Sequence, residues 1–168
     1  MADRVRSVVS IARYGLTDDR ASEHLRAAGW WADGAPVKEY EPILVALSRS
    51  PDPDLALRAV DRMRTGDKDG WSGLNQALAT DRGLRARLLS VLGASTALGD
   101  FVISRPGEWR RLLTDRQTSP VRYPGALLAA VENVKPSDAV RELRAAYRGL
   151  LLEVAAEDLA HLIEPDLP

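Results

Sequence analysis

The segment between Pro136 and Pro165 contains no other proline and a single glycine, Gly149. Pro136, Ser137 and Asp138 are typical of a helix start, because proline is tolerated in the first turn and a carboxylate there faces the positive end of the helix dipole. The segment therefore predicts a helix of roughly 27 residues, about 40 Å long at about 1.5 Å per residue. A helix of this length extends beyond one small core.

Two apolar stripes run along this predicted helix. The first follows the 3-4-3-4 spacing of one helix face, and the second occupies the C-terminal half. Because two faces imply two packing partners, we expect one stripe to pack on the rest of the chain and the other to meet a surface beyond it. The stripes consist of Val140, Leu143, Tyr147, Leu150 and Val154, and of Leu151, Ala155, Leu159 and Leu162.

Helix start and stop signals divide the rest of the chain into shorter helices. Asp52, Asp81 and Ser95 are predicted N-caps, and Gly15 and Gly29 are predicted left-handed helix ends. No segment alternates apolar and polar residues over a strand's length, so we expect almost no sheet. The sequence therefore predicts an all-α fold, a multi-helix bundle that ends in one long C-terminal helix.

The first two short helices are predicted to form a hairpin at the N-terminus. Trp30 and Trp31 follow it in a loop and are expected to anchor the hairpin on the remaining helices. A second loop is expected over residues 114 to 124. The inward faces of the hairpin consist of Val5, Val8, Val9 and Ala12 in one helix and of Ala21, Leu25 and Ala28 in the other.

Composition limits the classes of function. The 168 residues are 45% hydrophobic and 28% charged, which is typical of one globular domain, and the net charge is -1 with both signs interspersed. The chain has no cysteine, which excludes disulfides, thiolate metal sites and cysteine nucleophiles. No signal peptide or apolar run of about 20 residues is present. We therefore expect a cytoplasmic protein that binds neither nucleic acid nor membrane.

Three short motifs resemble known binding sites, and each is incomplete. The run Gly93–Gly99 lacks the lysine and hydroxyl of a phosphate-binding loop and is followed instead by Asp100. Asp52 and Asp54 have the spacing of a magnesium-binding carboxylate pair, but a helix start accounts for both. Residues Asp67–Gly70 lack the remaining ligands of a calcium loop.

The two histidines and the arginines give weaker signals. A metal site can be drawn from Glu157, Asp158 and His161, although a solvated helix end is the favoured interpretation. Arginines on one broad face of the last helix are able to reach phosphate or a partner's carboxylates, and a solvated basic face is the alternative. These are Arg141, Arg144 and Arg148, and a mildly basic neighbourhood upstream contains Arg105, Arg110, Arg111, Arg116 and Arg122.

Four stretches of the chain carry a family resemblance, and they occur in the family's order. They are Ala12–Asp18, Asp52–Arg58, Leu88–Asp100 with Arg105 and Pro106, and Leu143–Arg148 with Leu151–Leu159. Together they resemble the N-terminal part of bifunctional glutamine synthetase adenylyltransferase/adenylyl-removing enzymes of the actinobacterial type. The run Leu-Gly-Ala-Ser-Thr-Ala-Leu-Gly-Asp that ends at Asp100 is the most specific piece.

The resemblance implies a role in control of nitrogen assimilation. In that family a helical lead-in precedes a nucleotidyltransferase core that removes AMP by phosphorolysis, and a second core attaches AMP from ATP. Both cores hold Mg²⁺ through a Gly-Ser-Asp-x-Asp type motif that is absent here. Residues 1 to 168 are then one helical N-terminal domain or lead-in, truncated before the first core. Glutamine synthetase and a PII-type regulator are the implied partners.

On this interpretation the parent protein is an enzyme and the segment alone is not. No catalytic, cofactor-binding or metal-binding residue is assigned to the chain, and Mg²⁺ and ATP are implied only for the full-length protein. Glu153 departs from the family, which tends to have a basic residue there. An alternative is a free-standing helical protein-protein interaction module that docks through Trp30 and Trp31 or through the second stripe of the last helix. A third hypothesis is a self-contained helical enzyme built on Glu157, Asp158 and His161.

Overall fold

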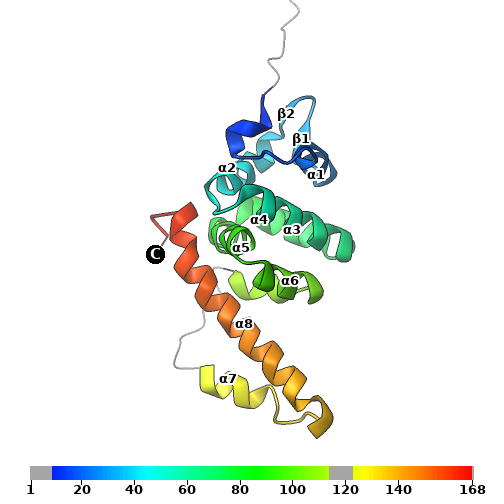
Figure 1. Ribbon diagram of the computed structural model, residues 1–168, viewed down its shortest axis with the longest axis vertical. Coiled ribbons are helices and arrows are strands. Elements are labelled where there is room, and N and C mark those ends of the chain that lie inside the picture. Colours follow the sequence, from blue (N-terminus) through cyan, green and yellow to red (C-terminus); the bar gives the residue numbers. More distant parts are fainter. Residues whose placement is uncertain (1–8, 114–122, 168) are drawn as a thin grey trace, which may run out of the picture.

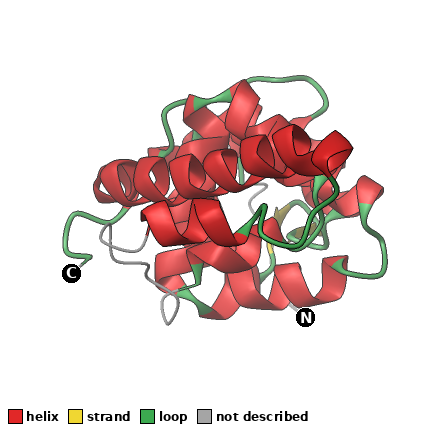
Figure 2. Cartoon of the chain, turned by 90° about the horizontal axis from the view of Figure 1, so that it is seen from below, coloured by secondary structure: helices red, strands yellow, loops and turns green. Residues whose placement is uncertain are grey.

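The computed structural model describes residues 9–113 and 123–167, and within these ranges the chain is almost entirely helical (Figures 1 and 2). The all-α prediction is confirmed, and the last helix is 28 residues long. The 3₁₀ helices are η1 (Ile11–Tyr14), η2 (Lys38–Tyr40) and η3 (Glu108–Leu112). The α-helices are α1 (Ala21–Ala27), α2 (Glu41–Arg49), α3 (Pro53–Gly66), α4 (Trp71–Thr80), α5 (Arg82–Ala94), α6 (Thr96–Ser104), α7 (Tyr123–Ala129) and α8 (Pro136–Ile163).

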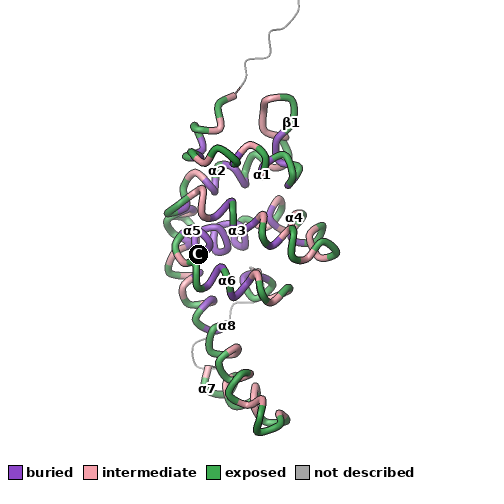
Figure 3. Tube along the Cα trace, turned by 45° about the vertical axis from the view of Figure 1, so that its right-hand side comes forward, coloured by how far each residue is buried: buried purple, intermediate pink, exposed green. Residues whose placement is uncertain are grey.

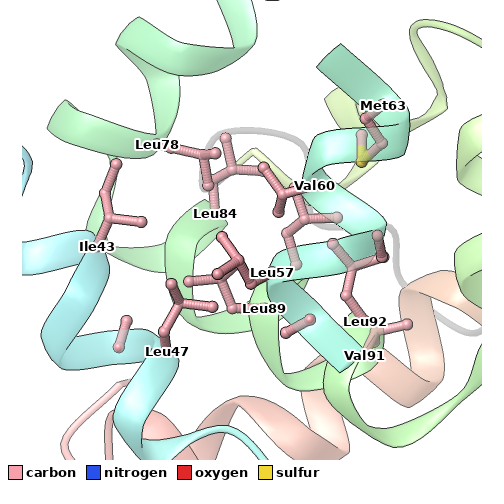
Figure 4. Close-up of a cluster of buried hydrophobic side chains, with 14 of the residues drawn as sticks. Ile43, Leu47, Leu57, Val60, Met63, Leu78, Leu84, Leu89, Val91 and Leu92 are labelled. Atoms are coloured by element: carbon pink, nitrogen blue, oxygen red, sulfur yellow. The ribbon is translucent and has the colours of Figure 1, made fainter. Parts of the chain in front are cut away.

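Helix α5 is the centre of the bundle. It is buried along its whole length from Gly83 to Gly93, and α2, α3, α4, α6 and α8 all pack against it. Figure 4 shows side chains of α2, α3 and α4 converging on the leucines of α5. Leu84, Leu88 and Leu89 have no exposed surface, so α5 is the helix around which the other helices bury their apolar side chains.

The predicted helix ends are confirmed by backbone geometry. The Asp52 carboxylate accepts from the Leu55 N–H at 2.8 Å, the Asp81 carboxylate from the Leu84 N–H at 2.9 Å, and the Ser95 hydroxyl from the Leu98 N–H at 3.3 Å. Gly15 and Gly29 have φ of 74° and 82°. These signals are local, because a cap bonds to backbone within its own first turn.

The N-terminal prediction needs correction. Among the described residues the first element is the single 3₁₀ turn η1, which Ser10 caps and Gly15 ends, and Val9 and Ser10 before it are not helical. A helix that continues through Val9 to Ala12 is therefore wrong, and the part of the hairpin prediction that rests on Val5 and Val8 lies outside the described residues.

Trp30 is buried, donates to the Asn75 side chain at 2.7 Å and packs against Trp71, so the expected anchoring on the remaining helices is confirmed for Trp30. Trp31 is buried against Tyr14 and begins the two-stranded antiparallel sheet of β1 (Trp31–Ala32) and β2 (Ala35–Pro36).

Two further elements differ from expectation. The sequence does not predict helix α4 (Trp71–Thr80), because Gly73 and the lack of a capping side chain at Gly70 weaken its helical signal. The expected loop 114–124 lies mostly outside the described residues, and its last two positions, Tyr123 and Pro124, belong to α7. In the part of the chain that the structure describes, no single helix is long and apolar enough to cross a membrane. Helices α5 and α6 reach that length and apolar content only when they are taken together, and the pair is bent by 120°.

The packing face of α8 differs most from the prediction. Its buried side consists of Gly149, Leu150, Leu152, Ala156, Ala160 and Ile163, whereas most of the predicted first stripe is exposed. Small residues at 149, 156 and 160 line the close approach of α8 to the bundle. Figure 1 shows the N-terminal half of α8 projecting beyond the bundle beside α7, and Figure 3 shows that this half is largely exposed.

Candidate functional site

The carboxylates that resembled a magnesium pair hold the backbone instead. Asp52 caps α3, and Asp54 accepts hydrogen bonds from the Thr17 N–H (3.0 Å), the Thr17 hydroxyl (2.7 Å) and the Asp18 N–H (3.2 Å). Asp54 therefore fastens the segment before α1 to the start of α3. The helix-start interpretation is confirmed, with an additional long-range contact that the sequence did not reveal.

Asp18 extends this contact into an ion pair. Its carboxylate accepts from the Arg20 N–H at 2.9 Å and from the Arg58 guanidinium of α3 at 2.9 Å. The Arg20 backbone hydrogen bond, followed by the Arg58 hydrogen bond, lowers the pKa of Asp18 below its ordinary value. The aspartates of this region thus have structural partners.

Glu157, Asp158 and His161 do not converge on one point. Glu157 accepts from the Arg87 Nε at 2.9 Å, while Asp158 and His161 are exposed. Within residues 9–113 and 123–167, no group of three or more His, Cys, Asp or Glu side chains is arranged to hold a metal ion. Glu157, Asp158 and His161 therefore do not form the joint metal site that can be drawn from their spacing.

Glutamates of α8 anchor its C-terminal half to the bundle. Their positions, four and then seven residues apart, place them on neighbouring sides of the helix. The pairs are Glu153 with Arg111 (3.0 Å), Glu157 with Arg87 (2.9 Å) and Glu164 with Arg82 (2.7 Å). Arg49 also donates to the Ile163 carbonyl at 3.1 Å and so caps the helix end. Arg111 belongs to η3, Arg82 and Arg87 belong to α5, and Arg49 belongs to α2.

Glu153 has a structural partner in Arg111. Arg111 lies across Gly149, where an added Cβ would be 3.1 Å from the guanidinium carbon. From there Arg111 reaches Glu153 on α8 and Glu108 on η3, at 3.0 and 2.6 Å. Glu153 is thus a structural residue of the α8 anchor, and a phosphate-binding role for that position finds no support.

A cleft of about 450 Å³ opens between the end of α6 and the N-terminal half of α8. The cleft lining consists of Phe101, Ser104, Arg105, Ser137, Val140, Arg141, Arg144, Ala145 and Arg148. Arg141 is paired with Asp138 and Glu142 at 3.0 and 2.9 Å. Within the described ranges no ion pair involves Arg105, Arg144 or Arg148. We call this the arginine cleft, and its excess of unpaired guanidinium groups favours anions.

An exposed apolar face runs along α8 on the side away from the bundle. Its large side chains are Val140, Leu143, Tyr147, Leu151 and Val154, which are 58%, 42%, 58%, 42% and 38% exposed. Their spacing of 3, 4, 4 and 3 residues keeps them on one side of the helix. We call this the α8 outer face. Val140 belongs both to this face and to the arginine cleft.

The α8 predictions were therefore partly correct. The sequence placed Arg141, Arg144 and Arg148 on one face, and the structure puts all three beside one cleft. Arg105 was not connected with them, because it lies more than 30 residues upstream and only the packing of α6 near α8 brings it close. The fold thus defines an all-α domain whose candidate site is an exposed surface on a long helix.

Comparison with known proteins identifies enzymes that contain a segment similar to this chain. The chain is homologous to a segment of bifunctional glutamine synthetase adenylyltransferase/adenylyl-removing enzymes. It is 41% identical over 165 residues to the Mycobacterium tuberculosis enzyme and 40% identical over 169 residues to that of Mycobacterium leprae. Each alignment covers 95% of this chain and 16% of the relative, so the chain spans about one sixth of these enzymes. No family model and no solved structure matches it.

Proposed function

We propose that this chain is the non-catalytic helical part of an enzyme that adenylylates and deadenylylates glutamine synthetase and so controls nitrogen assimilation. The 41% identity along 95% of the chain is the observation that carries this proposal. ATP and Mg²⁺ would be bound by other parts of such an enzyme. Glutamine synthetase and a PII-type regulator are the proposed partners, and the cytoplasm is the proposed location.

The geometry supports a positioning role. Asp52 and Asp54 hold the start of α3, and Glu153, Glu157 and Glu164 bind arginines, so these carboxylates have structural partners. Buried apolar residues and three ion pairs fix the C-terminal half of α8 on the bundle. A long helix that is fixed at one end and projects from the bundle at the other is suited to joining this domain to a neighbouring domain or partner.

Phosphate-dependent release of AMP from adenylylated glutamine synthetase tests the proposal. The matching segment of the Mycobacterium tuberculosis enzyme is replaced by this chain, and AMP release is compared among the chimera, the unmodified enzyme and the 168-residue chain alone. We expect release by the first two and none by the chain. ATP-dependent adenylylation by the same chimera controls for its folding.

Either of two results would contradict the proposal. AMP release by the isolated chain would show a catalytic centre within it. A chimera that adenylylates glutamine synthetase but releases no AMP would show that this chain cannot replace the matching segment in the adenylyl-removing activity.

A free-standing helical interaction module remains the second candidate, and the exposed α8 outer face favours it. The structure corrects the docking patches expected for such a module. Trp30 and Trp31 are 0% and 5% exposed, so they offer no surface. The second stripe of α8 is also divided, because Ala155 and Leu159 pack against the core.

A further inference from the structure

We propose that the α8 outer face and the arginine cleft form one docking surface, and that its occupant is an amphipathic helix of a partner protein with carboxylates along one flank. The inference goes beyond the proposed enzymatic role, because it specifies the chemistry of the partner. It stands on the exposure, spacing and charge of residues in α6 and α8.

The apolar half of the surface has the dimensions of a helix-binding seam. The 15 residues from Val140 to Val154 extend over about 21 Å of helix. Five large apolar side chains along this length remain 38% to 58% exposed, although the same helix buries its opposite side completely at Leu152 and Ala156. An amphipathic helix that carries apolar residues at the matching spacing would remove this face from water.

The arginines of the cleft form the charged half of the surface and favour a partner with negative charge beside its apolar face. Arg144 and Arg148 border the apolar residues, and Arg105 faces them across the cleft. Most arginines elsewhere in the described chain are paired, including Arg58, Arg62 and Arg82, whereas these three have no ion pair within the described ranges. Carboxylates on the partner would supply the missing partners through charge-assisted hydrogen bonds.

The shape of the cleft favours a protein segment over a small phosphate compound. The cleft is open, Arg144 and Arg148 are exposed, and Val140 and Phe101 add apolar surface to its lining. Small-ligand sites enclose most of the ligand surface. A chain segment that is apolar on one side and acidic on the next uses both halves of this surface.

A second copy of this chain fits less well than an acidic helix. If two α8 helices packed antiparallel through their outer faces, equivalent edges would meet, as in antiparallel coiled coils. The edge that contains Arg144 and Arg148 would then lie against the same arginines of the other copy. Like charges at such flanking positions oppose association.

Fluorescence anisotropy with two synthetic peptides tests the inference. Each peptide has about 18 residues, or five helical turns, with leucine at heptad positions a and d. One carries glutamate at the flanking positions and the other carries lysine at the same positions. We expect the 168-residue chain to bind the glutamate peptide at least about fivefold more tightly, and the difference to shrink as salt screens the charges.

Variants with matched controls locate the binding surface. Arg144→Glu should weaken binding of the glutamate peptide at least about fivefold, whereas Arg26→Glu, at an exposed arginine of α1, should leave it unchanged. Tyr147→Ser should weaken binding of both peptides, and Val45→Ser, at an exposed valine of α2, should weaken neither. Circular dichroism of each variant verifies that the bundle is folded.

Four results would overturn the inference. Equal binding of the two peptides would show that the surface does not distinguish acidic from basic partners. Unchanged binding by folded Arg144→Glu would show that Arg144 does not contribute to such a preference. Displacement of the glutamate peptide by stoichiometric inorganic phosphate would assign the cleft to a small anion. A dimer in light scattering that dissociates in Tyr147→Ser would assign the apolar face to a second copy. None of these measurements depends on glutamine synthetase, so their failure is distinct from failure of the proposed function.

Discussion

Gly149 lies where α8 meets the side chain of Arg111, and its lack of a side chain determines how closely the two approach. The guanidinium carbon lies 3.1 Å from the position that a Cβ would take, and Glu108 and Glu153 hold the guanidinium there. Asp54 is a comparable single residue, since its carboxylate receives three donors from Thr17 and Asp18. At this scale, individual residues join segments that are distant in sequence.

Gly149→Ala should therefore destabilise the protein, although alanine is the better helix former. The new methyl group would lie about 3.1 Å from the Arg111 guanidinium, which would have to shift while Glu108 and Glu153 hold it, and we expect a net loss of about 1 kcal/mol in the free energy of unfolding. Urea unfolding measures it. Gly73→Ala in α4 is the control, because no atom lies within 4 Å of its added Cβ, and it should stabilise the protein by about 0.5–1 kcal/mol. Stabilisation by both changes would contradict the role of Gly149.

Asp54→Ala should lower the free energy of unfolding by about 1–2 kcal/mol, because it removes the acceptor of three hydrogen bonds. The Thr17 and Asp18 amides should exchange faster with deuterium, since they lose their acceptor. Asp69→Ala, at an exposed aspartate, is the control and should be nearly neutral. Unchanged exchange at Thr17 in Asp54→Ala would exclude the proposed fastening.

The helix ends of this protein could be predicted from sequence, whereas the faces of its last helix could not. Asp52, Asp81 and Ser95 cap within one turn, so neighbouring residues contain the information. Which side of α8 is buried depends on the shape of α5 and η3, and close approach favours Gly149 and Ala156 over larger apolar residues. Hydrophobic spacing alone therefore selects a stripe of large apolar residues, and most of that stripe is exposed in the structure.

Two leucines of α8 provide a direct test of this assignment. Leu152 is 0% exposed and Leu143 is 42% exposed. Leu152→Ala should cost about 2–4 kcal/mol of unfolding free energy, because it leaves a cavity, and Leu143→Ala should cost less than about 1 kcal/mol. Chemical denaturation of both variants measures the difference. Equal losses would mean that the outer face is buried in solution.

The C-terminal anchor of α8 should depend on pH. The hydrogen bond from Arg82 is the main cause that lowers the pKa of Glu164 below its ordinary value. A carboxylate with a depressed folded-state pKa stabilises the fold above its unfolded pKa, about 4.3, and loses that contribution as the pH falls further. Thermal unfolding from neutral to acidic pH should show a shallower decline for Glu164→Gln than for the unchanged chain. Glu39→Gln, at an exposed glutamate, should follow the unchanged chain.

Across the whole molecule, burial is concentrated at one end of the long helix. The half from Gly149 to Ile163 is packed on α5 and tied by Glu153, Glu157 and Glu164, whereas the half from Pro136 to Arg148 has α7 as its main neighbour (Figure 3). The sequence predicted a helix that extends beyond its core. It could not show that the projecting part borders the arginine cleft, because Arg105 joins α8 only through the tertiary fold.

This division predicts unequal local stability along one continuous helix. Amide exchange depends on the free energy of the opening that exposes each N–H, and parts with few buried contacts open most easily. In deuterium exchange followed by mass spectrometry, peptides covering Pro136–Arg148 should exchange at least about tenfold faster than those covering Gly149–Ile163. Binding of the glutamate-flanked peptide should slow exchange mainly in the first group, because the occupant covers Val140, Leu143 and Tyr147. Uniform exchange along α8 would mean that the two halves open together, and protection confined to the second group would place the occupant elsewhere.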